Sequence, residues 1–338
     1  MGIKIGPLTT RNRVFLAPMS GVTDAPFRKL AHELGAGLVV TEMVASRELV
    51  GKRPDVLRRA AGTGCIFPLV IQLVGRESRW MAEGAKAAQD LGADIIDINM
   101  GCPAREVTGG LSGSALMRDL DHAQSLIEAT IAASKVPVTL KMRLGWDDNQ
   151  RNAPELARRA QALGVAMITV HGRTRCQFYK GRADWRAIRE VREVTTIPLV
   201  ANGDLVNASQ AGEMLGQSGA DAVMIGRGAY GRPWMLAALA EPLDKGSGRR
   251  TPLLHEQRLI VLHHYEAMLS HYGLELGQRI ARKHLGWYVE DLKTRNLLTE
   301  GEARSWRQAL VREEHPSLVR KTLHRLYDRA GFSNEEAA

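Results

Sequence analysis

The sequence predicts an α/β fold, a (β/α)8 TIM barrel, followed by an all-helical C-terminal domain. Three observations support this prediction: eight short apolar runs, helical patterns between them, and the loss of strand patterns after residue 252. Apolar runs without alternation are typical of strands that are buried on both faces of a parallel sheet. Eight such units in roughly 240 residues match the size of a barrel, whereas an open doubly wound sheet usually has fewer strands.

The expected strands and helices alternate along the first two-thirds of the chain. Helices are expected over residues 24–34, 81–91, 156–163 and 213–215. Asp24 is a suitable N-cap for the first of them, and a glycine follows the helical pattern at residues 35, 92 and 164. The eight expected strands are residues 14–17, 38–41, 69–73, 95–99, 138–141, 167–170, 199–201 and 222–225.

A change of composition over residues 241–252 divides the chain. Gly, Ser, Pro and charged residues replace the apolar periodicity there, which predicts a linker. We therefore expect a barrel domain over residues 1–243 and a helical domain over residues 253–334. The helical domain is expected to form a short bundle.

The chain is basic, with a net charge of +9 and a pI of about 9.7. Positive charge favours polyanions such as nucleic acid or a membrane surface, although a protein can also be basic without such a partner. No apolar run approaches the ~20 residues that cross a bilayer, and no secretory signal is expected. The three cysteines form no C-x-x-C pair, which favours a reducing cytoplasm over a disulfide framework.

Polar or glycine-containing segments lie at the ends of the expected strands. Because the C-terminal ends of barrel strands carry the chemistry, these segments form the candidate site. Any strand that leaves a core becomes polar, which explains one or two such residues, but the complete ring favours a ligand site. The segments are Pro18-Met19-Ser20-Gly21, Thr41-Glu42, Gln72, Asn99-Met100-Gly101-Cys102-Pro103, Lys141 with Arg143, His171-Gly172-Arg173, Asn202-Gly203-Asp204 and Gly226-Arg227-Gly228.

The loops after the last two strands predict a phosphate site. Glycines such as Gly203 and Gly226 let backbone N–H groups approach an anion closely, and Arg227 can add a bidentate contact. Residues 226–231 also match the pattern G-x-G-x-x-G, but no further β-α-β unit follows them. A dinucleotide-binding fold needs that unit, so we keep the phosphate loop and reject the dinucleotide fold.

Two further residues have a role if the ligand is a flavin. The cation of Lys141 can stabilise the reduced anionic ring, and Gln72 can hydrogen-bond to the pyrimidine edge of the ring. The alternative for Lys141 is an ion pair with a neighbouring acid in the barrel, such as Asp97.

Cys102 lies at the barrel mouth, between Gly101 and Pro103, which end the strand and form a tight turn. A single cysteine is usually a small buried apolar residue, but exposure at the mouth of a site favours a functional thiol. With an ordinary pKa of about 8.5 this thiol is protonated at neutral pH and can serve as a general acid. Cys65 and Cys176 lack this setting.

Five segments together resemble the tRNA-dihydrouridine synthases, and their details look closest to the bacterial B subgroup. Residues 282–288 extend the resemblance into the helical domain. The segments are Ala17-Pro18-Met19-Ser20-Gly21-Val22-Thr23-Asp24, Asp97-Ile98-Asn99-Met100-Gly101-Cys102-Pro103, Val170-His171-Gly172-Arg173-Thr174, Ala201-Asn202-Gly203-Asp204 and Ile225-Gly226-Arg227-Gly228.

The resemblance implies a reaction and a set of site residues. It implies FMN as cofactor, NADPH as reductant and uridine in the D-loop of tRNA as substrate, with hydride going to C6 and a proton from Cys102 to C5. Asn99 and Arg143 are implied to contact the substrate, and Arg282 and Lys283 to contact tRNA. The implied FMN-binding residues are Pro18, Met19, Ser20, Gln72, Lys141, His171, Asn202, Gly203, Asp204, Gly226 and Arg227.

Two other functions are compatible with parts of this pattern. A flavin barrel that reduces a free pyrimidine, such as dihydroorotate or dihydropyrimidine dehydrogenase, can share the strand end that carries Cys102. Such an enzyme does not need a basic helical appendage, so the C-terminal helical domain of this chain favours a tRNA substrate over a free pyrimidine. An RNA-binding protein built on an inactive barrel is disfavoured by the intact Cys102, Lys141 and glycine turns. No obligate protein partner is expected.

Overall fold

The computed structural model describes residues 2–62, 64–243 and 250–335. The chain divides into two compact units: residues 1–228 with 236–249, and residues 229–235 with 250–338. The linker prediction is wrong at its start, because helix α10 (Met235–Leu243) continues through residue 243. Residues 244–249 of the predicted linker lie outside the described residues.

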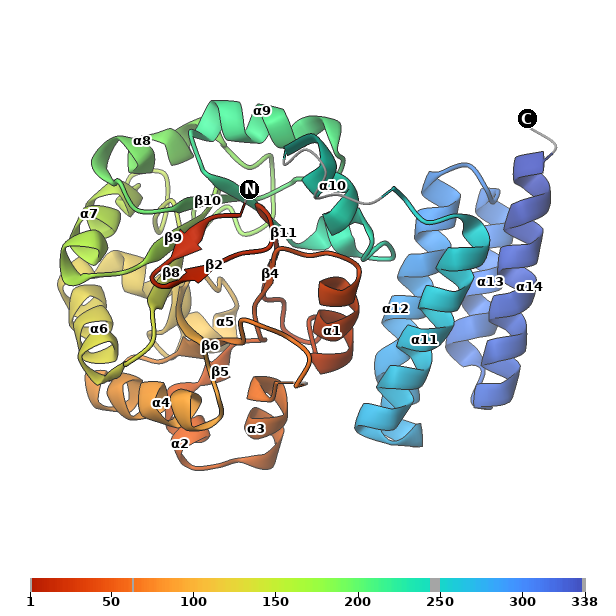
Figure 1. Cartoon of the computed structure of the whole chain (residues 1–338), viewed down its shortest axis with the longest axis horizontal. Coiled ribbons are helices and arrows are strands. Elements are labelled where there is room, and N and C mark those ends of the chain that lie inside the picture. The colour runs from red at the N-terminus through yellow and green to blue at the C-terminus, as the bar shows by residue number, and fades with distance from the viewer. Residues whose placement is uncertain (1, 63, 244–249, 336–338) are drawn as a thin grey trace. The chain divides into compact units, whose positions relative to one another are not determined.

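The first unit is a closed parallel barrel, as predicted (Figure 1). Its strands are β3 (Val14–Leu16), β4 (Leu38–Val39), β5 (Val44–Ala45), β6 (Val70–Val74), β7 (Ile95–Met100), β8 (Val138–Arg143), β9 (Met167–His171), β10 (Leu199–Asn202) and β11 (Ala222–Ile225). They pair in the order β4-β3-β11-β10-β9-β8-β7-β6-β5, all in parallel. A parallel bridge between Val40 and Val70 joins the two ends of this sheet and closes the ring.

The second position of the ring is occupied by two short strands in place of one. The sequence predicted a strand over residues 38–41, but regular pairing stops after β4 and resumes at β5. Thr41 stays attached to β6, because its hydroxyl accepts a hydrogen bond from the Gln72 amide at 3.0 Å. The buried carboxylate of Glu42 turns toward the loop after β3 and accepts a hydrogen bond from the Gly21 amide at 2.5 Å.

An N-terminal hairpin that the sequence did not predict closes the bottom of the barrel. It consists of β1 (Lys4–Ile5) and β2 (Leu8–Thr9), which pair antiparallel. Ile5 packs in one cluster with Met167 and Ala222, the first residues of β9 and β11. Since apolar side chains fill the N-terminal ends of the strands, the C-terminal ends are left for a ligand.

Capping residues mark the start or the end of several helices of the barrel. The Asp24 carboxylate caps α1 by accepting a hydrogen bond from the Phe27 amide at 3.0 Å, as the sequence predicted. Gly164 ends α7 with a left-handed φ of 100°, which favours glycine. The helices are α1 (Ala25–Glu33), α2 (Ser46–Val50), α3 (Pro54–Ala60), α4 (Ser78–Asp90), α5 (Arg105–Thr108), η1 (Gly113–Arg118), α6 (Leu120–Ala133), α7 (Ala153–Leu163), α8 (Arg186–Val194), α9 (Ser209–Ser218), η2 (Arg227–Ala229) and α10.

The second unit contains helices and no strand among its described residues. It contains α11 (Leu254–Tyr272), α12 (Leu274–Thr294), α13 (Glu300–Arg312) and α14 (Pro316–Glu335). Buried side chains such as Met268, Leu285 and Leu326 form its core. Tyr230, from the segment that follows the barrel, belongs to this unit and stacks on Trp287, with the two ring centroids 4.0 Å apart. No helix among the described residues is long and apolar enough to cross a membrane.

Candidate active site

The strand register arranges the predicted residues in layers at the C-terminal end of the barrel. Gln72, Asp97 and Thr139 are direct partners on β6, β7 and β8. One layer higher, Asn99 is paired with Lys141. At the top, Arg143, His171 and Asn202 are paired across β8, β9 and β10. Residues that lie far apart in the sequence are therefore brought together by register alone.

The Cys102 loop is fixed by hydrogen bonds to its backbone. The side-chain oxygen of Asn99 accepts from the amides of Gly101 at 3.1 Å and Cys102 at 2.9 Å. The Cys102 carbonyl accepts from the Ser114 hydroxyl at 2.8 Å, and Arg143 Nε donates to the Gly101 carbonyl at 2.8 Å. Burial raises the pKa of the half-buried Cys102 thiol, so the thiol keeps its proton at neutral pH.

Asn99 is itself oriented by a buried chain of polar side chains. Its Nδ2 group donates to Gln72 Oε1 at 2.8 Å, and Gln72 Nε2 donates to Asp97 Oδ2 at 2.6 Å. The Thr139 hydroxyl donates to Asp97 Oδ1 at 2.6 Å. Because a carboxylate only accepts, Asp97 fixes which way each amide points. We name Thr139, Asp97, Gln72 and Asn99 the amide relay.

Lys141 donates to Asn202 Oδ1 at 3.2 Å and does not form an ion pair with Asp97. His171 Nδ1 lies 2.9 Å from the same oxygen, while Asn202 Nδ2 donates to the Met224 carbonyl at 2.8 Å. Since Asn202 Oδ1 can only accept, His171 must carry its proton on Nδ1. Arg173 Nη1 faces His171 Nε2 at 3.3 Å, which satisfies the second ring nitrogen.

The charge states of Lys141 and His171 follow from their burial. Burial lowers the pKa of Lys141 to about 8, so the ammonium is charged at neutral pH but more acidic than in solution. Burial, followed by the charges of Arg143 and Lys141, holds the pKa of His171 well below its usual value. The mouth of the barrel therefore presents a cationic Lys141 beside a neutral imidazole.

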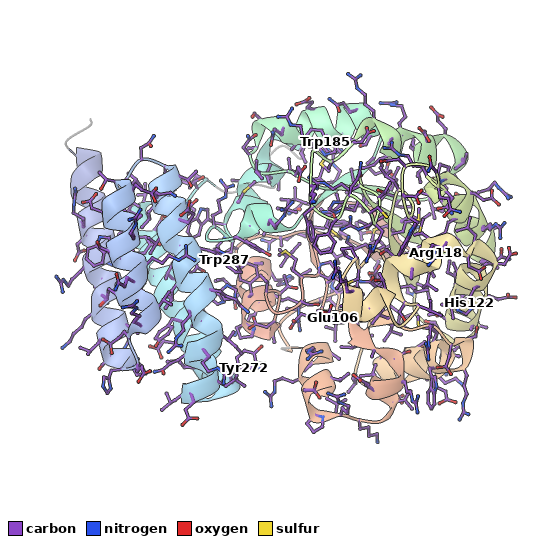
Figure 2. The ribbon with its side chains drawn as sticks, turned by 180° about the vertical axis from the view of Figure 1, so that it is seen from behind. Glu106, Arg118, His122, Trp185, Tyr272 and Trp287 are labelled. Carbon is purple, nitrogen blue, oxygen red and sulfur yellow. The ribbon has the colours of Figure 1, made fainter. Side chains whose placement is uncertain are left out.

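The predicted phosphate turns are shaped by glycine and by one buried arginine. Gly203 has a φ of 123°, and a Cβ there would lie 2.7 Å from the Ala183 side chain. Arg173, which is 1% exposed, donates to Asp204 Oδ2 at 2.5 Å, and Arg227 donates to Asp204 Oδ1 at 3.2 Å. Trp185, which Figure 2 labels, donates to the Gly203 carbonyl at 2.8 Å. Asp204 thus holds the turns together, and Arg227 stays half-exposed beside it.

Arg143 is almost fully buried and links two loops. Besides the Gly101 carbonyl, it donates from Nη1 to the carbonyls of Thr174 and Phe178, both at 2.9 Å. Its guanidinium lies 5.5 Å from the ring of Tyr179, and that of Arg227 lies 4.8 Å from the same ring. Phe178 is 43% exposed, with a left-handed φ of 54°. The loop after β9 therefore presents aromatic side chains at the mouth, held by arginines.

The remaining predicted residues lie in three places. Pro18, Met19 and Ser20 form the loop after β3, where the Met19 amide donates to the Thr23 hydroxyl at 2.8 Å. Gly226 follows β11 at the same end of the barrel. Arg282 and Lys283 lie on α12 of the helical unit, where Arg282 Nη2 is 4.0 Å from the carboxylate of Glu314.

Sequence reasoning missed several residues that shape the site. Thr139 and Ser114 carry no motif, and Arg173 was seen only as part of a strand end. The alternation of polar residues along β8, at positions 139, 141 and 143, was the available signal for Thr139. Among the described residues, no cluster of His, Cys, Asp and Glu could hold a metal ion.

Comparison with known proteins identifies relatives over nearly the whole chain. The sequence profile of the family described as dihydrouridine synthase matches residues 15–325. A protein of Rhizobium leguminosarum bv. phaseoli named probable tRNA-dihydrouridine synthase is 54% identical over 331 residues, covering 98% of this chain and 100% of the relative. A Xanthomonas campestris pv. campestris protein named tRNA-dihydrouridine synthase B is 44% identical over 321 residues, covering 94% of this chain and 97% of the relative.

Among solved structures, the barrel is similar to an old yellow enzyme homologue from Zymomonas mobilis. The TM-score is 0.52 at 16% identity, over 76% of this chain and 95% of the other. Histamine dehydrogenase from Rhizobium sp. 4-9 gives a TM-score of 0.54 at 15% identity, over 79% of this chain and 50% of the other. At such identities these likenesses show the barrel fold alone.

Proposed function

Because this chain belongs to the dihydrouridine synthase family, we propose that it reduces uridine to 5,6-dihydrouridine in the D-loop of tRNA. The names of relatives at 54% and 44% identity support tRNA as the substrate. The observation that carries the proposal is the Cys102 loop, which Asn99 fixes at the barrel mouth near Lys141. Burial raises the pKa of the Cys102 thiol and so favours its protonated form. Residues 1–243 would form the catalytic domain and residues 253–334 the tRNA-binding domain.

We propose FMN as the cofactor, which the residues at the mouth fit, and NADPH as the reductant. When bound, the flavin would supply the hydride that adds to C6 of uracil. Lys141 fits an electron-rich ring, Arg227 fits the phosphate, and Gly203 is required for the turn because a Cβ there would lie 2.7 Å from the Ala183 side chain. The residues proposed to hold FMN are Pro18, Met19, Ser20, Gln72, Lys141, His171, Asn202, Gly203, Asp204, Gly226 and Arg227.

Cys102 would complete the reduction by giving its proton to C5. Saturation of the C5–C6 double bond needs one hydride and one proton, and the thiol is left as a thiolate that takes up a proton from solvent. A general acid must be protonated before it reacts, and burial of Cys102 favours that state. The uridine must leave its stack to reach the thiol, at a cost of a few kcal/mol.

Lys141 is the group best suited to stabilise charge on a uracil carbonyl. One of its three N–H groups is used by Asn202, which leaves two for a ligand. His171 has both ring nitrogens engaged, so it serves mainly to orient Asn202. Asn99 and Arg143 remain proposed substrate contacts, although their hydrogen bonds already hold the Cys102 loop.

The test is reduction of tRNA by the purified protein. With FMN, NADPH and an unmodified tRNA transcript, the protein should form dihydrouridine, whereas free uridine monophosphate should not be reduced. Cys102→Ala should keep NADPH oxidation and lose dihydrouridine formation, and Cys65→Ala, at an exposed cysteine, should keep both. A protein that takes up no FMN, or that reduces the free nucleotide as well as tRNA, would contradict the proposal.

A further inference from the structure

Two arginines at the barrel mouth lie against one tryptophan. Arg118 ends η1, Trp146 lies in the loop after β8, and Arg175 lies in the loop after β9. The guanidinium carbons of Arg118 and Arg175 lie 5.0 and 4.8 Å from the centroid of the Trp146 ring. We name these three residues the Trp146 cluster. Cation–π contacts at these distances hold each guanidinium in place without a carboxylate.

The Trp146 cluster lies beside the loop that carries Cys102. The Arg175 amide donates to the Gly145 carbonyl at 3.0 Å, which fixes its loop against that of Trp146. Arg175 Nη2 donates to the Thr108 hydroxyl at 3.3 Å, on α5 just after Cys102. At the other end of η1, a Cβ on Gly113 would lie 2.9 Å from the Cys102 carbonyl. Both arginines therefore come from elements that pack directly on the Cys102 loop.

The positive charge of the Trp146 cluster is not neutralised by its surroundings. Within the described part of the chain, neither Arg118 nor Arg175 forms an ion pair with a carboxylate. Nearby acids are used elsewhere: Asp148 pairs with Arg151 at 2.7 Å, and Asp119 caps α6. Glu106 is the exposed acid of α5, and Figure 2 labels it together with Arg118 on the barrel.

We propose that the Trp146 cluster is a phosphate clamp for the RNA strand that flanks the uridine at Cys102, an inference that rests on the proposed function. A base that leaves its stack to enter the barrel brings the phosphates on its two sides to the rim of the mouth. Stacking leaves the N–H edge of the exposed Arg118 able to match phosphate oxygens in a bidentate geometry. Arg175 already uses Nη2 on the Thr108 hydroxyl, so it would add positive charge and a further N–H contact. The exposed Lys180 and Arg182, on the same loop as Arg175, add positive charge to this side.

Binding of an unmodified tRNA transcript to the FMN-loaded enzyme tests the clamp. Filter binding at several salt concentrations should show that Arg118→Ala and Arg175→Ala each weaken tRNA binding roughly ten-fold. Each should also reduce the slope of log K against log salt by about 0.7–0.9, the effect of one lost phosphate contact. Lys135→Ala, which removes an exposed cation before β8 at the opposite end of the barrel, should change neither quantity.

A second variant separates the stacking from the charge. Trp146→Leu keeps both arginines but removes the ring that holds them, so tRNA binding should weaken while the salt slope stays near that of the wild type. In all variants, flavin reduction by NADPH should be unchanged, and the defect should appear as a raised KM for tRNA with kcat retained. Arg118→Ala and Arg175→Ala enzymes with wild-type affinity and slope would overturn the clamp.

The binding and activity measurements together distinguish a failure of the clamp proposal from a failure of the proposed function. If the wild-type enzyme makes dihydrouridine while both alanine variants bind tRNA normally, the clamp proposal is wrong and the proposed function stands. If the wild-type enzyme neither binds nor reduces tRNA, both the clamp and the proposed function are wrong. If the two variants lost affinity for vesicles of anionic phospholipid but not for tRNA, the surface would serve a membrane and the clamp would be wrong.

Discussion

The side-chain oxygen of Asn99 accepts a hydrogen bond from the amide of Cys102 at 2.9 Å, which ties the thiol-bearing loop to the top of β7. The same oxygen holds the Gly101 amide, and the other side of the Asn99 amide group is held by Gln72. The position of the thiol therefore depends on a side chain that needs no contact with the reacting base. This relationship makes Asn99 a positioning residue as well as a proposed substrate contact.

Asn99→Ala should impair proton donation more than flavin reduction. Loss of the acceptor frees the Cys102 loop, and misplacement of a general acid typically costs about 10²-fold or more. Dihydrouridine formation should fall by about that factor in single-turnover assays, with NADPH oxidation by FMN unchanged. Asn99→Asp keeps the acceptor oxygens and should retain more activity than Asn99→Ala. Equal loss in both variants would show that the amide acts on substrate and not on the loop.

Thr139→Val tests the far end of the amide relay. The substitution leaves Asp97 Oδ1 buried without its 2.6 Å partner, a loss that typically costs about 1–3 kcal/mol in the free energy of unfolding. Thr169 is the matched control, because it is equally buried on β9 and its hydroxyl has no hydrogen-bond partner among the described residues. Thr169→Val should change stability by less than about 0.5 kcal/mol. Urea denaturation of both variants measures the difference, and equal values would show that the relay adds no stability.

The barrel itself was predictable because its strands are buried on both faces. Their apolar runs, such as residues 95–99, stand out without any knowledge of register, and seven of the eight predicted positions correspond to a single strand. The break between β4 and β5 was not predictable, because it depends on Glu42 reaching the Gly21 amide across the mouth. The N-terminal hairpin was missed because each of its strands has two residues.

The site was predictable in its members but not in their connections. Strand ends gave Cys102 and Lys141, since the C-terminal ends of barrel strands converge. The partners of these residues depend on register: Gln72 meets Asp97 across 25 residues of sequence, and Lys141 meets Asn202 across 61. The alternative pairing of Lys141 with Asp97 was also compatible with the sequence, although the neighbouring glycine turns favoured the flavin role. Only the register shows that Asp97 is already engaged by Thr139 and Gln72.

Lys141→Met should stabilise the flavin-free protein. Burial lowers the pKa of Lys141 from 10.5 to about 8, which at about 1.4 kcal/mol per pKa unit means that the folded state loses about 3 kcal/mol by carrying this charge. Since the unfolded state binds the proton more tightly, wild-type stability should rise as pH increases from about 8 to 10.5. The variant should gain a few kcal/mol at pH 7, and its advantage should shrink over that range.

Urea denaturation at pH 7 and pH 10 measures this difference directly. Lys135→Met removes an exposed charge and is the control for a general effect of charge on stability. The same Lys141→Met enzyme should lose dihydrouridine formation, since the cation is proposed to act on the flavin and on a uracil carbonyl. A variant with unchanged stability at pH 7 would mean that the Lys141 charge is compensated in the folded protein.

Cys102 should behave as a weak acid and not as a nucleophile. Burial raises its pKa above that of an ordinary cysteine, so the thiolate fraction at pH 8 is smaller than for an unperturbed thiol. Alkylation by iodoacetamide, followed by mass spectrometry of each cysteine peptide, should give a midpoint for Cys102 above the pKa of about 8.5 that an unperturbed cysteine has. The midpoint reports the pKa separately from access to the reagent, because access changes the limiting rate and not its pH dependence. The exposed Cys65 provides the internal reference. A midpoint near neutral pH would show a thiol poised for nucleophilic attack, which is the opposite of what proton donation to C5 requires.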